Sequence, residues 1–312
     1  MIKILIYVAG RDTHNLNPAL NKFVKLYPKV NVQIVGSTGI KPLKFSNNVE
    51  VNFIPFDKIA DFEFDFVVVT GGSDDINGIA PQVHFGDIVK SLRLLNIPED
   101  KIILDRVLCI PNFTFEKYDK LKKSRPTIFA MNCFGGVLYH RFGLPFYSPI
   151  INMWLTVDDM IKLLRNPIKN IESEIQFDEW KNETPGMGDY PAFRINTGGD
   201  DIILHMNHYG RLGVDFAKKK WDERKQRINW FNVIPCICTE NPNVLEEFDA
   251  MPFAKKICFV NFKSDKDSAF YLNPILDGNK SLGDLVNRFG LGYNQYNYDL
   301  WDMLLYGKKS YY

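Results

Sequence analysis

The first third of the chain alternates short apolar runs with segments whose apolar residues recur every three or four positions. Apolar runs of strand length occupy 2–10, 30–38, 49–56, 65–72 and 100–108, and helical spacing occurs at 16–28 and 82–97. These two patterns are typical of buried strands and amphipathic helices. Strands interleaved with helices of this length predict βαβ units and a small parallel sheet.

The second part of the chain mixes the two patterns less regularly. Apolar runs predict strands at 127–132, 234–240 and 255–263, and a further strand at 200–210 that runs into polar residues. Helices are predicted at 156–166, with Thr156 as N-cap, at 213–230, at 298–307, and between a glycine pair at 135–136 and Pro145. We therefore expect an α/β protein whose second part is a mixed α/β domain.

The expected domain organisation follows from a lysine-rich stretch bounded by prolines. Residues 112–126 lie between Pro111 and Pro126, which is typical of a connection between domains. The sequence thus predicts a Rossmann-like domain at 1–111, a linker at 112–126 and an α/β domain carrying the active site at 127–312.

The overall charge balance argues against binding to nucleic acid or to an anionic membrane. The 312 residues contain 38 basic and 37 acidic side chains, a formal net charge of +1, so no global field draws in such partners. The N-terminal apolar run is too short for a signal peptide, and no run reaches the length of a membrane span. An odd number of scattered cysteines favours a reducing compartment, and the expected location is cytoplasmic (Cys109, Cys133, Cys236, Cys238 and Cys258).

Glycines stand at the carboxyl ends of three strands predicted for the first domain. Gly10 ends the first strand and Arg11 follows it, the second strand ends in "GSTG" at 36–39, and Gly71 and Gly72 end the strand at 65–72. Parallel sheets bind ligands at the carboxyl ends of their strands, where glycines let backbone amides approach a phosphate. Because the G-x-G-x-x-G spacing is missing, the alternatives of a nucleotide or nucleotide-sugar site and of glycines that merely end strands stay open.

A cysteine stands between a predicted strand and a predicted helix. Asn132 and Cys133 follow the apolar run, and Gly135 and Gly136 fall in the first helical turn. Free N–H groups and the helix dipole at such a position lower a thiol pKa and bind anions. Three interpretations stay open for Cys133: a nucleophile, a neighbour of a bound anion, or a small residue that fills a tight corner.

Two histidines three positions apart form the second candidate feature. His205 and His208 would point to opposite faces of a continuous strand, but both can reach a cleft if the strand ends at His205. Either histidine is a candidate general base. Asp200 and Asp201 lie just upstream, so a metal pair is an alternative. The sequence does not supply a full set of metal ligands, and no metal is therefore implied.

The third candidate feature is an arginine pair beside a tryptophan. Trp221, Arg224 and Arg227 follow one another at helical spacing, which predicts two guanidinium groups on adjoining turns next to an aromatic ring. Such a group is suited to a phosphate and a sugar ring or base. The alternative is a solvated basic face.

Three stretches in order resemble a family of uncharacterised bacterial proteins that are labelled exopolysaccharide or capsule biosynthesis proteins. They are "NCFGGVLYHRFGLPFYSPIINMWL", "YPAFRI" followed by "DDIILHMNHY", and "KKWDERKQRINW", and the resemblance covers about 132–233. It implies that the motif residues of the family recur here as Asn132, Cys133, Gly135, Gly136, His208, Trp221, Arg224 and Arg227. Phe134 stands where the family more often has tryptophan. The first domain more loosely resembles the small Rossmann-like domains of sugar-modifying enzymes.

Three functional hypotheses follow. The first is a transferase in polysaccharide assembly that acts on a sugar nucleotide or lipid-linked sugar, with His208 as base, Arg224 and Arg227 on phosphate, and the 135–136 turn on substrate oxygens. The second is an acyltransferase or hydrolase that uses Cys133 with His205 or His208. The third is a non-catalytic binding or scaffold protein. The two enzyme hypotheses predict that Cys133, His208 and Arg224 converge.

Overall fold

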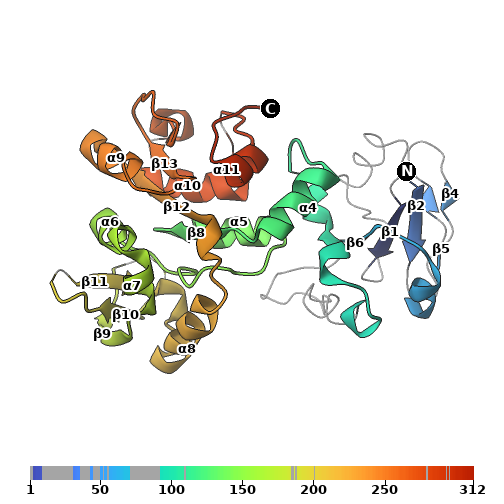
Figure 1. Cartoon of the computed structure of the whole chain (residues 1–312), viewed down its shortest axis with the longest axis horizontal. Helices are drawn as coiled ribbons and strands as arrows, with labels where there is room; N and C mark the ends of the chain where they lie inside the picture. The colour runs from blue at the N-terminus through green and yellow to red at the C-terminus, as the bar shows by residue number, and fades with distance from the viewer. Residues whose placement is uncertain are drawn as a thin grey trace. The chain divides into compact units, whose positions relative to one another are not determined.

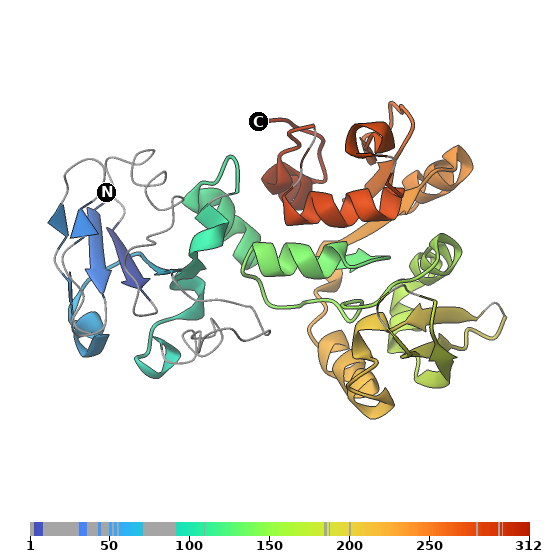
Figure 2. The ribbon, with the colours of Figure 1, turned by 180° about the vertical axis from the view of Figure 1, so that it is seen from behind.

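The computed structural model describes residues 3–8, 31–35, 43–44, 50–51, 53–54, 56–70, 92–108, 110–183, 186, 188–199, 201–278, 280–292, 294 and 296–312. Figures 1 and 2 show the chain from opposite sides. It divides into two compact units, Met1–Phe113 and Thr114–Tyr312, and each is described here by itself.

Unit 1 is built on a parallel sheet with the strand order β5-β2-β1-β6-β7. The strands are β5 (Phe53–Ile54), β2 (Asn31–Val35), β1 (Lys3–Val8), β6 (Phe66–Thr70) and β7 (Ile102–Leu104). Val67, Val68 and Val69 of β6 are fully buried, as expected for a central parallel strand that is covered on both faces. Among its described residues the unit also contains a short antiparallel strand pair and short helical segments: β3 (Leu43–Lys44), β4 (Glu50–Val51), η2 (Phe56–Asp61), η3 (Glu99–Lys101) and α3 (Asp105–Leu108).

The α/β fold class and the parallel sheet in the first part of the chain are thereby confirmed. The predicted glycine site, with Gly10, Arg11, Gly71 and Gly72, lies outside the described residues. The same holds for the predicted helix at 16–28 and for most of the one at 82–97.

Unit 2 contains a second parallel sheet in the order β14-β13-β12-β8. Its strands are β8 (Thr127–Ala130), β12 (Val233–Thr239), β13 (Ile257–Val260) and β14 (Ala269–Tyr271). The helices of this part are α5 (Phe134–Arg141), α9 (Pro242–Asp249), η6 (Pro274–Asp277), α10 (Leu282–Leu291) and α11 (Leu300–Tyr306). Helix α10 packs on α5 (Figures 1 and 2). Gly290 allows this close approach, because a Cβ there would lie 3.0 Å from the Phe134 ring.

An antiparallel sheet in the order β11-β10-β9 forms the other part of unit 2. It consists of β9 (Ile175–Lys181), β10 (Tyr190–Ile195) and β11 (Ile202–His205). The accompanying helices are α6 (Val157–Arg165), α7 (Pro167–Glu172), η4 (Asn207–Tyr209), α8 (Val214–Lys225) and η5 (Trp230–Asn232). Thr156 accepts the Asp159 N–H at the start of α6, which confirms the predicted cap, and α6 contacts both β11 and β12. This helix therefore joins the two sheets of unit 2.

The stretch expected to be a linker is largely helical. Helix α4 (Phe115–Ser124) is capped by Thr114 and packs on α11. Lys117 forms an ion pair with the Asp299 carboxylate at 3.0 Å, and the Tyr118 ring meets the Trp301 ring edge-on. Most of 112–126 thus belongs to unit 2. None of the helices in the described part of the chain has the length and apolar character needed to cross a bilayer.

Candidate active site

The structure brings Cys133 and His208 together. The Cys133 Sγ and the His208 Nε2 lie 3.3 Å apart, although 75 positions separate the residues along the chain. Cys133 is half-buried and His208 is exposed. A thiol in hydrogen-bond contact with an imidazole is the arrangement that nucleophilic catalysis by cysteine requires.

Cys133 is placed by the turn between β8 and α5. The strand ends at Ala130, and Cys133 occupies the N-cap position of α5. The Asn132 Oδ1 accepts the Phe134 N–H at 3.1 Å, and the Cys133 side chain makes no capping hydrogen bond. Asn132 thus takes the capping role, which leaves the thiol available to His208.

The two glycines of the motif differ in their surroundings. A Cβ at Gly135 would lie 3.1 Å from the Ala130 Cβ, so this glycine lets α5 pack closely against β8. At Gly136 a Cβ would meet only the Ile151 side chain at 3.5 Å and the Asn152 Oδ1 at 3.8 Å. Both residues lie in the first turn of α5, where backbone N–H groups have no acceptor within the helix. Their predicted role in binding substrate oxygens stays a prediction.

His208 reaches Cys133 because β11 ends at His205 and the chain enters the short helix η4. The His208 N–H donates to the Asn152 carbonyl at 3.4 Å. Asn152 has a φ of 61°, in the left-handed region that asparagine tolerates better than most residues. The 150–152 segment thus supports the turn that carries the imidazole.

Burial shifts both members of the pair away from the charged form. It raises the pKa of the Cys133 thiol above its ordinary value of 9.0. Protein atoms around the imidazole lower the pKa of His208 below its ordinary value of 6.5, although the residue keeps contact with solvent. Near neutral pH the resting pair is therefore a thiol beside a neutral imidazole that can accept its proton.

His205 lies in different surroundings. Its ring stacks on Trp154 with centroids 3.7 Å apart, and its Nδ1 is 3.4 Å from the Tyr190 hydroxyl and 3.7 Å from the Glu183 carboxylate. The residue is buried, and desolvation lowers the pKa of its imidazole. Of the two predicted bases, His208 is the one in contact with Cys133.

Arg224 contacts Tyr209, the residue that follows His208 in the chain. Its Nη1 donates to the Tyr209 hydroxyl and, at 3.5 Å, to the Ile151 carbonyl, and its guanidinium lies 5.2 Å from the centre of the Phe146 ring. Burial raises the pKa of Tyr209, so its hydroxyl stays protonated and donates to the same Ile151 carbonyl at 3.0 Å. Arg224 is thus tied directly to the residue that follows His208.

The remaining predicted residues have other positions. Trp221 is buried in α8, and its indole N–H has no acceptor within the described part of the chain. Arg227 is exposed beyond the end of α8, and its backbone N–H donates to the Arg224 carbonyl. Cys236 and Cys238 lie on β12, within the strand predicted at 234–240. Across the described residues, no group of three or more His, Cys, Asp or Glu side chains is arranged to hold a metal ion.

Sequence reasoning did not single out Tyr209, Ile151 or Asn152. Tyr209 directly follows His208, and the other two lie within the first of the three quoted stretches. A signal was present in Asn152, because asparagine before an apolar run often marks a left-handed position. The partners of a buried tyrosine hydroxyl, by contrast, become visible only in three dimensions.

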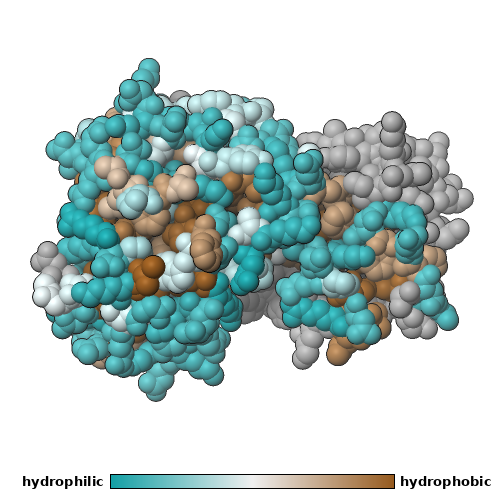
Figure 3. Space-filling model, in the orientation of Figure 1, coloured by the Kyte–Doolittle hydropathy of each residue, from teal (hydrophilic) through white to brown (hydrophobic). Residues whose placement is uncertain are grey.

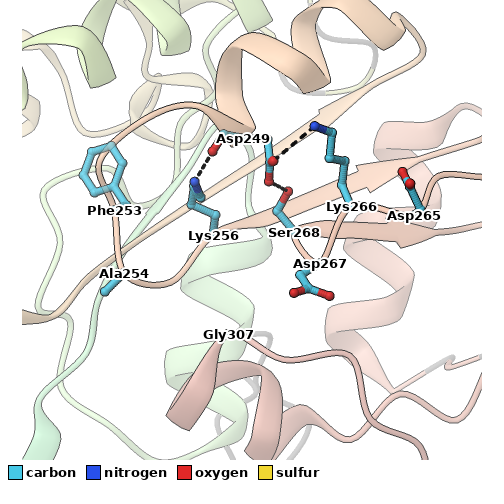
Figure 4. A pocket seen from close by; sticks show the side chains of 9 residues that line it. All are labelled: Asp249, Phe253, Ala254, Lys256, Asp265, Lys266, Asp267, Ser268 and Gly307. Atoms are coloured by element: carbon cyan, nitrogen blue, oxygen red, sulfur yellow. Dashed lines mark hydrogen bonds and ion pairs between the residues drawn. The ribbon is translucent and has the colours of Figure 1, made fainter.

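A pocket of about 480 Å³ lies beside the parallel sheet of unit 2, at the end where β13 and β14 begin (Figure 4). It is next to Lys256 and Ser268, which precede β13 and β14, whereas Cys133 follows the carboxyl end of β8. Ser268 donates to Asp249 at 2.5 Å, and Lys266 pairs with the same carboxylate at 3.6 Å. Among the lining residues, Lys256, Lys266 and Ser268 all bind Asp249, and none of the predicted site residues lines the pocket.

The surface of unit 2 also has an apolar area. Figure 3 shows apolar side chains gathered over the region in which Figure 1 places β8, β12 and α6, with hydrophilic residues around them. An apolar area with a polar border is typical of a binding surface.

Comparison with known proteins shows that the described site lies within a family match that covers most of the chain. Residues 105–304 match a family described as a domain of unknown function, DUF1919. The chain belongs to this family. The DUF1919 match extends on both sides of the 132–233 range of the resemblance seen in the sequence, and its description carries no polysaccharide label.

A relative of this DUF1919 protein occurs in Haemophilus influenzae. It is an uncharacterized protein that is 26% identical over 195 residues, which cover 58% of this chain and 86% of that protein. Most of the relative therefore corresponds to the matched part of this chain.

Proposed function

We propose that the chain is an enzyme of acyl transfer or acyl hydrolysis in which Cys133 is the nucleophile and His208 the general base. The observation that supports this proposal is the 3.3 Å contact between the Cys133 Sγ and the His208 Nε2 at the start of α5. The lowered pKa of His208 favours the same roles, because a base must be neutral to accept the thiol proton.

The reaction balances with these two side chains. His208 takes the proton of the Cys133 thiol while the sulfur attacks the acyl carbonyl carbon, and the leaving group departs with that proton. The product is a thioester on Cys133. A hydroxyl group or water then attacks the thioester, gives its proton to His208, and releases the sulfur, which regains the proton. The first-turn N–H groups of α5 are suited to stabilise the oxyanion of both steps.

A saccharide hydroxyl is our proposed acceptor. The support for it is the resemblance of 132–155, 190–209 and 219–230 to proteins labelled as polysaccharide biosynthesis proteins. The sequence hypothesis of a sugar-nucleotide transferase assigned His208 as base toward the same kind of hydroxyl. Transfer of an acyl group to a sugar hydroxyl would use His208 in this same role. It would also use the adjacent Cys133 thiol, which would carry the acyl group.

The proposal predicts that p-nitrophenyl acetate acetylates the full chain once, on Cys133. Intact and peptide mass spectrometry would measure the site and the rate. Cys133→Ser should lose the acetyl group, and His208→Asn should slow its formation by about a hundredfold or more, since general-base catalysis contributes on this scale.

Matched controls come from side chains of the same type elsewhere in unit 2. Cys238→Ser alters a half-buried cysteine whose Sγ lies 3.7 Å from the Met131 sulfur, and His140→Asn alters an exposed histidine in α5. Both should leave the rate unchanged. Equal acetylation of Cys133 and Cys238, or an unchanged rate in His208→Asn, would contradict the assignment.

A further inference from the structure

Arg224 differs from Arg165 and Arg194 in the way its guanidinium is used. Two edges of a guanidinium can each present a pair of parallel N–H groups, and the Nε–Nη2 edge is the one that carboxylates commonly bind. Arg165 and Arg194 use this edge: the first binds Glu247 through Nε at 3.0 Å and Nη2 at 2.7 Å. Arg194 binds Asp178 through the same two nitrogens, at 3.2 and 2.7 Å.

In Arg224 this edge has no acceptor among the described residues. The contacts to Tyr209 and Ile151 both come from Nη1, which leaves Nε and Nη2 unused. Neither nitrogen belongs to the fully buried atoms that lack a partner. Both nitrogens of the N–H pair therefore keep contact with solvent.

The burial of Arg224 makes the missing counter-ion significant. Arg224 is 9% exposed. The side chains of Arg165 and Arg194, which pair with carboxylates, are 61% and 42% exposed. A buried charge is normally paired, because removal from water costs free energy that an opposite charge returns. Within the described residues, the most buried of these three arginines is the one without a carboxylate.

The Nη1 contacts hold the free edge in place. The Tyr209 hydroxyl and the Ile151 carbonyl fix one side of the guanidinium, and the Phe146 ring lies against it. Tyr209 directly follows His208, so the fixed group is connected to the turn that carries the base. A guanidinium held in this way is prepared to bind two oxygen atoms of one anion.

We propose that Arg224 binds an oxyanion of the substrate, a carboxylate or phosphoryl group, through its Nε–Nη2 edge. This inference rests on the proposed function, because it names the class of acyl substrate that Cys133 and His208 would act on: one with an anionic group. It also narrows the sequence prediction of an arginine pair to a single arginine with a defined pair of N–H groups.

The test is the binding of inorganic phosphate and of acetate to the full chain, measured by calorimetry. We expect phosphate to bind the wild-type protein and to bind Arg224→Gln about tenfold more weakly or worse, because two charge-assisted hydrogen bonds are lost. Arg224→Lys should be intermediate, since it keeps the charge but not the paired N–H groups. Acetate distinguishes the sources: tighter binding of acetate would indicate a carboxylate, and tighter binding of phosphate a phosphoryl group.

Arg165→Lys is the matched control, because Glu247 already occupies the same edge of that arginine. Phosphate affinity should not change in this variant. Equal affinity in wild type and Arg224→Gln, or no binding of either anion to the wild-type protein, would overturn the proposal.

Two further measurements keep the result interpretable. If Arg224→Gln does not fold, the Nε–H resonance of Arg224 in the wild-type protein should shift on addition of phosphate, and an unshifted resonance would overturn the proposal. Cys133→Ser should bind phosphate as the wild type does. Binding that persists without any acylation of Cys133 would therefore contradict the proposed function and leave the anion site standing.

Discussion

The protonation of the Cys133–His208 pair determines how its chemistry should depend on pH. Burial holds the pKa of the thiol above 9.0, and crowding by protein atoms holds that of the imidazole below 6.5. Both shifts favour the neutral forms, so the proton stays on sulfur until a substrate arrives. This distinguishes the pair from a cysteine site with a preformed thiolate and imidazolium.

We therefore expect acylation of Cys133 to persist as pH falls from neutrality and to be lost only below 6.5, where His208 becomes protonated. Alkylation by chloroacetamide, which needs the thiolate, should instead keep rising beyond pH 9.0. Mass spectrometry over about pH 5 to about pH 10 measures both rates. An alkylation rate that is already constant near neutral pH would reveal a preformed ion pair and contradict the prediction.

The contact between α5 and β8 depends on the side of the helix that faces the strand. Gly135 faces the Ala130 Cβ, which is fixed to the backbone and cannot turn aside, whereas Gly136 faces side-chain atoms at ordinary contact distances. The two neighbouring glycines therefore form a natural matched pair for the packing of this element.

Gly135→Ala should destabilise the protein by about 1 kcal/mol or more, because the added methyl group pushes α5 away from β8. Gly136→Ala should be neutral or slightly stabilising, since alanine has the higher helix propensity and no clash results. Urea unfolding of both variants gives the comparison. Equal effects would show that close packing at Gly135 is not what stabilises this turn.

Elements differed in how far the sequence predicted them. The strands β6, β8 and β12 were recognised because buried strands covered on both faces are nearly continuous apolar runs. The antiparallel strands β9 and β10 were missed: most of β9 is exposed or half-buried, and β10 contains Pro191. The pattern lacked the apolar continuity on which the prediction depended.

The site was predictable to a similar degree. Cys133 and His208 could each be identified from the sequence, because a thiol at a strand-to-helix turn and a histidine at a strand end have recognisable local contexts. Their contact depends on where β11 ends, at His205, and on the short helix η4 that follows it and carries His208. The separation of His205 from the pair follows from its stacking on Trp154, which periodicity does not reveal.

At the scale of the whole molecule, the candidate chemistry is confined to unit 2. Cys133, His208 and Arg224 all lie within Thr114–Tyr312, which has a hydrophobic core of its own. Most of the DUF1919 match, residues 105–304, falls in the same unit. A compact unit with its own hydrophobic core is expected to fold independently.

We therefore predict that a fragment of residues 114–312 folds cooperatively in urea and is acetylated on Cys133 at a rate within about twofold of the full chain. Circular dichroism and mass spectrometry test the two parts of this prediction. A second fragment, 105–312, begins where the family match begins and keeps α3. If only the longer fragment folds, the boundary after Phe113 is wrong. If neither fragment folds, unit 1 is required for the stability of unit 2. The core within 114–312 would then be insufficient to offset the conformational entropy of its chain.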